Sequence, residues 1–397
     1  MNKVRLGSIA SLKTGPFGTQ FSAKEYTETG VPVINVKNIG YGEVIENDLD
    51  YISEETKNRL SEHILMQGDI VFGRKGSVDR HAYISENYEG WVQGSDCIRV
   101  RCDDEINKKY ISHYLKLNHI KKMVNNAAVG STMASMNTDI LRDIEILLPE
   151  LKVQNKIERI VSLIEAKICL NRKINDNLEE QLQILFDYWF KQFDFPNENN
   201  EPYKRSGGKM YWDSVYKRNI PTGWEILKFD DLVATPPKTP SIMAPDYKNI
   251  GLYPIIDQAS SYITGRTDDI SYVYPNEDDC VVFGDVTKVF KYINFPFAKG
   301  TDGTKIIRSI NNRIPALILY YLIKDAKLPN KGFARYYSLL REIYVLVPSS
   351  DVSEKFIVAT KPIVSKIRAN LEENYKLQIT RDWLLPMLMN GQATIDD

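Results

Sequence analysis

The 397-residue sequence lacks several features that would place it in common classes of protein. No apolar run approaches the 18 residues of a membrane-spanning helix, and Met1–Arg5 leads into no signal-peptide core. We therefore expect a cytoplasmic protein without a membrane span. The four cysteines are scattered, which argues against a disulfide framework or a zinc site and for reduced thiols; they are Cys97, Cys102, Cys169 and Cys280.

Motifs of catalysis are also missing. No Gly-x-Gly-x-x-Gly and no phosphate-loop pattern occurs, and Thr301–Lys305 lacks the glycines that such a loop needs. Pro236-Pro237 lacks the flanking amide or acid and the aromatic residue of an adenine methyltransferase motif. The four histidines have no ligand spacing, so core or surface positions explain them. We expect no catalytic residue and no metal site in this chain.

An excess of basic residues is absent too, because 51 Lys and Arg balance 52 Asp and Glu. Many nucleic-acid binders are strongly basic, since neutralising phosphates drives their affinity. Composition alone therefore gives no support for nucleic-acid binding, and any basic surface must be local. It leaves open a protein-interaction scaffold without a DNA role.

What the sequence does contain is an internal duplication. Three short segments of the first half have echoes in the second half, and they occur in the same order; the pairs are Arg5–Ile9 with Lys228–Leu232, Asp69–Gly73 with Cys280–Gly284, and Ile144–Pro149 with Ile343–Pro348. A duplicated unit predicts two similar globular domains related by a rough two-fold, with residues 1–149 and 221–348 as their bounds.

Each domain is expected to mix strands and short helices. In the first half, apolar runs bounded by turn residues predict strands at Gly30–Val36, Gly68–Phe72 and, as a pair, Trp91–Gln93 and Cys97–Val100. Ile111–Leu117 has a helical pattern. The small polar residues at 130–137 indicate a loop, and loops on a rigid frame are where binding residues tend to lie.

Two long helices are predicted at 150–192 and 349–397. No Gly or Pro occurs from Leu151 to Gln192, and seam positions alternate by four and three residues. The first seam is Ile157, Val161, Ile164, Ile168, Asn171, Asn175, Leu178, Leu182, Leu185 and Trp189; the second is Ile357, Thr360, Val364, Ile367, Leu371, Asn374 and Gln378. We expect the two helices to pair as an antiparallel coiled coil, in which Asn fixes the register. The alternative is that each helix lies on its own domain, and Pro362 is expected to start or kink the second.

The connector, predicted at 193–220, carries the most telling resemblance. Its residues Pro202–Met210, followed by Ile220–Glu225, are similar to the specificity subunits of type I restriction-modification systems. Gly30–Ile34, Gly68–Gly76 and the tails of both halves, Leu141–Pro149 and Leu340–Pro348, fit the same family. The second half departs more, since Cys280–Asp285 lacks the Arg-x-Gly ending.

The resemblance implies a mixed α/β protein with two target-recognition domains, each reading one half of a split, asymmetric sequence in double-stranded DNA. The paired helices would set the half-site spacing and dock two methyltransferase subunits, and motor-nuclease subunits would join them. S-adenosylmethionine and ATP would belong to those partners, so the chain itself would need no cofactor. Two readers on a stiff spacer make the spacing part of the recognised sequence.

Candidate DNA-reading residues are the polar side chains in loops between the predicted strands, because Arg and Lys read guanine and Asn and Gln read adenine. The best cluster is Arg74–Ser77, where Gly76 lets the backbone approach a phosphate. The candidates are Lys37, Asn38, Arg74, Lys75, Ser77, Arg80, Gln93 and Ser95 in the first domain, then Gln258, Ser260, Lys288, Lys291, Lys299, Thr304, Lys305, Arg335 and Tyr336 in the second. Thr132, Ser135 and Asn137 are equally well explained by a helix-capping loop.

Overall fold

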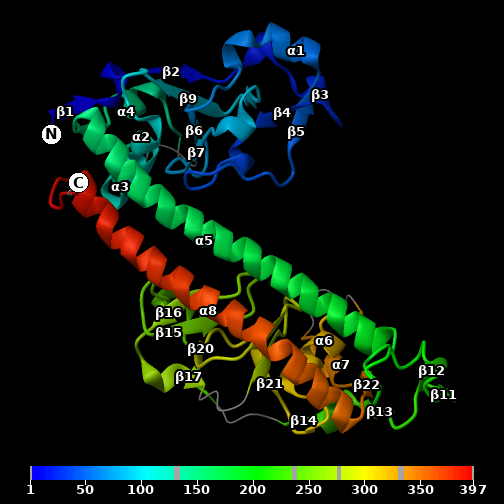
Figure 1. Cartoon of the computed structure of the whole chain (residues 1–397). Coiled ribbons are helices and arrows are strands. Elements are labelled where there is room, and N and C mark those ends of the chain that lie inside the picture. Colours follow the sequence, from blue (N-terminus) through cyan, green and yellow to red (C-terminus); the bar gives the residue numbers. More distant parts are fainter. Residues whose placement is uncertain (1, 129–134, 235–238, 275–278, 330–334, 396–397) are drawn as a thin grey trace. The chain divides into compact units, whose positions relative to one another are not determined.

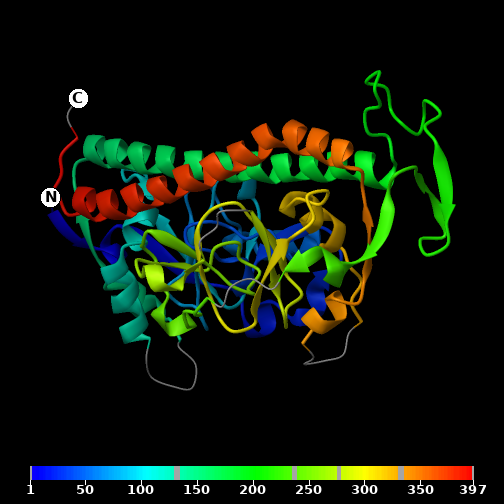
Figure 2. The same ribbon diagram turned by 90° about the horizontal axis from the view of Figure 1, so that it is seen from below.

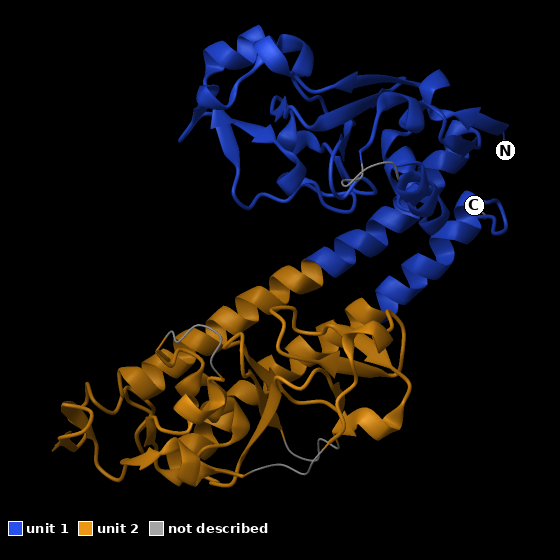
Figure 3. Ribbon diagram, turned by 180° about the vertical axis from the view of Figure 1, so that it is seen from behind, with its two compact units in different colours: residues 1–169, 376–397 blue, residues 170–375 orange. Residues whose placement is uncertain are grey.

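The computed structural model describes residues 2–128, 135–234, 239–274, 279–329 and 335–395. The chain divides into two compact units, shown in Figure 3. Unit 1 comprises residues 1–169 and 376–397, and unit 2 comprises residues 170–375. Both combine sheets with helices, which confirms the predicted mixed α/β class.

Unit 1 contains one strand pair and two four-stranded sheets (Figure 1). β1 (Asn2–Arg5) pairs antiparallel with β10 (Glu145–Leu148). The first sheet has the order β2-β9-β6-β7, formed by Ala10–Thr14, Cys97–Cys102, Ile70–Gly73 and His81–Tyr83. The second has the order β3-β5-β4-β8, formed by Tyr26–Thr27, Asp50–Ile52, Val31–Ile34 and Val92–Gln93, with β4 and β8 parallel. The short helices of unit 1 are α1 (Glu54–Arg59), α2 (Lys108–Leu115), α3 (Asn118–Ala127) and α4 (Thr138–Arg142).

Unit 2 repeats this plan. β13 (Glu225–Lys228) pairs with β22 (Tyr344–Val347). One sheet has the order β14-β21-β18-β19, formed by Val233–Ala234, Thr304–Ser309, Cys280–Gly284 and Phe290–Ile293. The other has the order β16-β15-β20-β17, formed by Gly265–Thr267, Tyr253–Ile256, Phe297–Lys299 and Val273–Tyr274, with β15 and β20 parallel. Helices α6 (Ala316–Ile323) and α7 (Tyr337–Leu340) follow. The difference lies at the sheet edge, where β3 joins β5 in unit 1 but β17 joins β20 in unit 2.

The sequence echoes occupy equivalent places in the two units. Leu6 and Phe229 are fully buried and directly follow β1 and β13, the strands that pair with the last strand of each unit. The Leu6 amide donates to the Ile144 carbonyl at 2.8 Å, and the Phe229 amide donates to the Ile343 carbonyl at 2.9 Å. The predicted duplication is therefore a duplication of structure.

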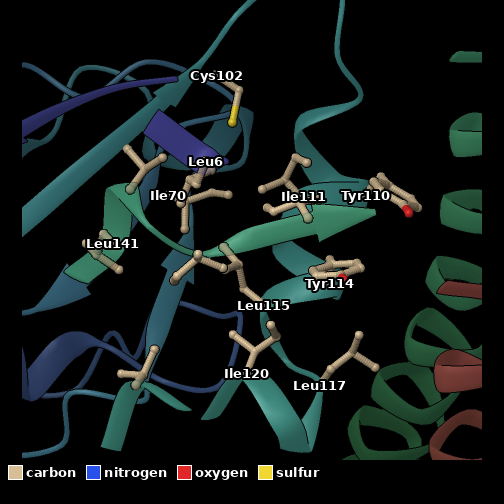
Figure 4. Packing of buried hydrophobic residues seen from close by; sticks show 14 of the residues in the cluster. Leu6, Ile70, Cys102, Tyr110, Ile111, Tyr114, Leu115, Leu117, Ile120 and Leu141 are labelled. Carbon is tan, nitrogen blue, oxygen red and sulfur yellow. The ribbon is translucent and has the colours of Figure 1, made fainter. Parts of the chain in front are cut away.

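The core of unit 1 forms where α2 packs on the first sheet (Figure 4). Ile111, Tyr114 and Leu115, the residues that gave the helical pattern, are all buried there. The helix begins three residues before the predicted start and ends at Leu115. One strand prediction was wrong: β8 and β9 do not pair with each other, because residues 94–96 lead the chain from one sheet into the other.

The two long helices are α5 (Leu151–Phe186), extended by a π-helical turn at Asp187–Lys191, and α8 (Ser350–Met389). Pro362 was expected to start or kink the second helix, but α8 begins at Ser350 and contains it. Pro362 removes the hydrogen bond to the carbonyl of Val358, and both residues are exposed. Water can therefore solvate that carbonyl, which lowers the cost of the proline.

In unit 2 the second part of α5 lies antiparallel beside the first part of α8 (Figures 1 and 2). Asn171 Nδ2 donates to Asn374 Oδ1 at 3.0 Å, and Asn370 Nδ2 donates to Asn175 Oδ1 at 2.8 Å. All four amides are buried. The predicted pairing is confirmed here, and the predicted seam residues of both helices are buried or half-buried.

Unit 1 uses the other ends of the same helices. Ile157 and Val161 of α5 share one buried cluster with Leu385, Leu388 and Met389 of α8. Each unit is therefore built on its own segment of α5 and of α8. This answers the alternative of unpaired surface helices for the described residues.

The connector of unit 2 forms a hairpin of β11 (Met210–Asp213) and β12 (Arg218–Pro221). Beneath it Phe195 stacks on Tyr203 and on Trp224, with ring centroids 4.5 Å and 5.5 Å apart. These aromatic rings attach the connector to the core of unit 2, and Tyr203 and Trp224 belong to the residues that carried the family resemblance.

Candidate nucleic-acid interface

Backbone hydrogen bonds bring four separate segments of unit 1 together at the strand ends. The Arg74 amide, directly after β6, donates to the Asp96 carbonyl at 2.7 Å. The Arg74 carbonyl accepts from the Met136 amide at 2.8 Å, and the Gly94 amide donates to the Ile34 carbonyl at 2.9 Å. The loops after β4, β6 and β8 and the segment before α4 therefore form one continuous surface.

We call this the unit 1 loop surface and define it by Tyr41, Arg74, Lys75, Ser77, Arg80 and Ser95, all exposed or half-buried. Lys75 lies 3.1 Å from an Asp96 carboxylate oxygen. Gly76, at the tip of the turn, has φ +79° and open space around it. A side chain here would strain the turn, so glycine keeps the tip both tight and accessible.

Two first-domain candidates are buried and have other roles. Asn38 is 0% exposed, and its amide donates to the carbonyls of Ile45 and Asn47 at 3.0 Å and 3.1 Å. Gln93 is buried and donates to the Lys13 and Cys97 carbonyls. In this structure the two side chains hold loops together from inside, so base reading by them stays a prediction that would require these bonds to open.

Lys37 remains exposed but is neutralised within its own loop. Its ammonium lies 2.8 Å from Asp48 and 3.1 Å from Asp50, and the hydrogen bond to Asp48 raises the pKa of Lys37. A lysine held by two carboxylates is a weak candidate for a phosphate or a base. Contact with DNA would require those pairs to open.

The residues before α4 have two different roles, one of which is the helix capping given above as an alternative to DNA reading. Asn137 is the N-cap, and its side chain accepts from the Ile140 amide at 2.8 Å. Ser135 is exposed and forms a bridge with Lys75 at the loop surface. Thr132 lies outside the described residues.

Unit 2 assembles its loops through the same three backbone bonds. The Asp285 amide donates to the Gly303 carbonyl at 2.8 Å, the Tyr336 amide donates to the Asp285 carbonyl at 2.8 Å, and the Gly300 amide donates to the Ile256 carbonyl at 2.9 Å. The unit 2 loop surface therefore matches the first in construction. Its exposed or half-buried candidates are Gln258, Ser260, Lys288, Lys299, Lys305 and Arg335.

The two surfaces differ most at one equivalent position, which is Arg74 in unit 1 and Asp285 in unit 2. The Asp285 carboxylate is buried, accepts from the Tyr337 amide at 2.8 Å and lies 3.6 Å from the Lys305 ammonium. A cation at the first surface is thus replaced by a helix-capping anion at the second. Different side chains on one frame give the two surfaces different chemistry.

Three second-domain candidates are buried in this structure. Lys291 donates to the Asp257 and Ser261 carbonyls at 2.8 Å and 2.6 Å, and burial lowers its pKa. Thr304 and Tyr336 are also buried, and the Tyr336 ring lies 4.2 Å from the Lys288 ammonium. Like Asn38 and Gln93, these side chains support the surface from below rather than forming it.

Sequence reasoning missed Tyr41, which belongs to the unit 1 loop surface, and Lys121, whose charge lies beside it. Tyr41 comes from the loop after β4, and Lys121 comes from α3. The Arg80 guanidinium and the Lys121 ammonium lie 4.9 Å and 4.5 Å from the Tyr41 ring centroid. Tyr41 was passed over because no local pattern predicts a contact among three distant segments.

The described residues contain neither a metal-binding group nor a membrane-spanning helix. No group of three or more His, Cys, Asp and Glu is placed to hold a metal ion. No helix in the described ranges is long and apolar enough to cross a membrane.

Comparison with known proteins gives these surfaces a context. Residues 1–180 match the family model described as the type I restriction modification DNA specificity domain. Residues 1–180 belong to this family. The domain contains the unit 1 loop surface and most of α5.

Similarity continues beyond that domain. The type I restriction enzyme MjaIX specificity subunit of Methanocaldococcus jannaschii is 22% identical over 398 residues, covering 94% of this chain and 89% of the relative. The HindI specificity subunit of Haemophilus influenzae is 24% identical over 169 residues, covering 40% of this chain and 36% of its own length. The chain is thus similar to type I specificity subunits over nearly its full length.

A solved structure shares the fold. The crystal structure of the type I restriction-modification system S subunit from M. genitalium superposes with a TM-score of 0.54 at 16% identity, covering 100% of this chain and 96% of that one. The likeness supports the fold described above, including the part of the chain that lies beyond the specificity domain.

Proposed function

We propose that the chain is the DNA sequence-recognition subunit of a type I restriction-modification complex, acting in the cytoplasm, with each loop surface reading one half of a split target. One observation carries the proposal: the same backbone frame is built twice and presents different side chains at equivalent positions, Arg74 in unit 1 and Asp285 in unit 2. Identical frames fit two similar DNA segments, and different side chains let the two segments differ in sequence.

The helices would act as spacer and docking frame. α5 and α8 have 36 and 40 residues, which corresponds to about 55–60 Å at 1.5 Å per residue. In the proposed complex two methyltransferase subunits dock on these helices, and motor-nuclease subunits join for cleavage. The chain would hold neither S-adenosylmethionine nor ATP; methylation and cleavage would be carried out by the partners.

The charge balance fits this division of work. With a net charge of −1, the chain has few cations to spare for phosphates, so partner subunits would supply much of the backbone contact. The isolated chain should then bind DNA weakly and lose that binding as salt rises. Tight, salt-insensitive binding by the chain alone would contradict this.

The second candidate function is a duplicated scaffold that binds proteins and not DNA, which the near-neutral charge favours. The specificity-domain match over residues 1–180 weighs against it. Neighbouring genes offer a simple test, since adjacent methyltransferase and helicase-nuclease reading frames favour the restriction complex.

The deciding experiment maps methylated adenines in the host genome with and without this gene. We expect methylation of one split sequence to disappear on deletion and to return with the wild-type gene. Complementation with the Arg74→Ala variant should relax one half of the sequence and leave the other half unchanged. A methylation pattern that survives deletion would refute the proposal.

A further inference from the structure

Two cationic side chains lie close to an exposed aromatic ring at the unit 1 loop surface. Tyr41 is 49% exposed, and its ring centroid lies 4.9 Å from Arg80 Cζ and 4.5 Å from Lys121 Nζ. The face of a tyrosine ring attracts cations because of its quadrupole. Two like charges this close to one ring repel each other, so an anion bound beside them would relieve the repulsion.

Neither cation is neutralised within the described part of the chain. No ion pair of Arg80 or Lys121 occurs among the described residues, and the buried Nε of Arg80 has no hydrogen-bond partner there. Burial lowers the pKa of Lys121, Arg381 lowers it further, and Asp79 and Asp382 offset this only in part. This differs from Lys37 and Lys75, which are paired with carboxylates.

The three residues are held in place by separate elements. Ile120 and Val124, which precede and follow Lys121 in the sequence, pack α3 against the core of unit 1. The Tyr41 loop is fixed at its tip, where the Gly42 amide donates to the His81 carbonyl at 2.7 Å. His81 directly follows Arg80, and its Nε2 lies 2.9 Å from Ser112 Oγ of α2. The cluster is therefore organised before any ligand arrives.

We infer that Tyr41, Arg80 and Lys121 form a binding site for a backbone phosphate of DNA, beside the bases that the Arg74 turn would read. The inference rests on the proposed function and adds to it a contact that carries no sequence information. Arg80 belongs to the same loop between β6 and β7 as Arg74, so one loop carries both the phosphate site and the base-reading position. A site of this kind positions the duplex for the reader.

The experiment uses the assembled complex and measures equilibrium binding to a cognate duplex and to an unrelated duplex over a series of salt concentrations. Lys121→Ala should weaken binding to both duplexes by a similar factor, and the slope of log affinity against log salt should fall by about 0.9, the value for one lost phosphate. Lys122→Ala is the matched control, because Lys122 is the exposed next residue of α3. It should behave as wild type.

Two further variants distinguish the role of the Tyr41 ring from that of its hydroxyl, and their melting temperatures show whether they fold. Tyr41→Phe keeps the ring and should bind as wild type, whereas Tyr41→Ala should reduce the salt slope as Lys121→Ala does. Equal melting temperatures would exclude misfolding as the cause.

The possible failures are distinguishable. If Lys121→Ala equals Lys122→Ala, or changes only the preference for the cognate duplex, the phosphate site is wrong. If Lys121→Ala prevents partner subunits from assembling, the cluster binds protein instead. If the wild-type complex does not distinguish the two duplexes, the proposed function itself fails.

Discussion

The buried amides between α5 and α8 in unit 2 should be coupled strongly enough to measure. Asn175→Leu removes the oxygen that accepts from Asn370 Nδ2 at 2.8 Å. Asn370 is 1% exposed, and its own Oδ1 already has no partner among the described residues. The abandoned amide therefore cannot turn to water or to a neighbour.

The magnitude follows from that burial. A buried polar group left without its partner costs about 1–3 kcal/mol, whereas replacing both partners by apolar groups can be nearly neutral. We expect Asn175→Leu and Asn370→Leu each to reduce the free energy of unfolding by about 2 kcal/mol. Independent effects would give about 4 kcal/mol for the double variant, but we expect less than about 1 kcal/mol because no amide is left unpaired.

The assay is denaturant unfolding of the full chain, followed by fluorescence of the buried Trp189 and Trp224 of unit 2. The exposed seam neighbour Ile184 provides a control, since Ile184→Leu should leave the midpoint unchanged. A double variant whose loss equals the sum of the single losses would refute the reasoning, because the two amides would then not depend on each other.

Three other predictions concern the DNA-reading turn, the helices and acid stability. Arg74→Ala should weaken binding of the assembled complex to its target by about 1–3 kcal/mol if the side chain reads a guanine, and unchanged affinity would exclude that role. Deleting seven residues from α5 should alter the tolerated half-site spacing but not the half-site sequences, as read by adenine methylation mapping; a fixed spacing would count against the spacer role. Burial lowers the pKa of His81 to about 3, so the unfolded chain binds a proton that the folded chain excludes. Its contribution to stability is complete above pH 6.5 and is lost as pH falls toward 3; thermal melts should show a loss of about 2 kcal/mol between pH 6.5 and 5, and a flatter profile for His81→Gln.

The repeated features of the fold could be predicted because their signals are local. The seam from Ile157 to Leu185 is a periodic pattern in one stretch of chain, and so is the run that forms β6. The duplication needed only the comparison of short segments such as Asp69–Gly73 and Cys280–Gly284. Pairing of β8 was missed because a two-residue strand contains too little pattern to identify its partner.

The candidate sites were harder to predict for a definite physical reason. Asn38 and Lys291 are residue types that read DNA at a surface and that also satisfy carbonyls in an interior. Sequence order does not distinguish these uses, because burial depends on segments that meet only after folding. The Tyr41 cluster shows the same limit from the other side, since its cations come from a turn and from α3.

The three hydrogen bonds that hold each set of loops together are formed by main-chain amides and carbonyls. They lie at Arg74 and Gly94 in unit 1 and at Asp285 and Gly300 in unit 2. Every amino acid except proline carries those same atoms. Side chains at these loop ends can therefore be substituted, or one loop exchanged for another, while the fold beneath them is retained. A lineage built this way can acquire new targets by small genetic steps while its architecture stays constant.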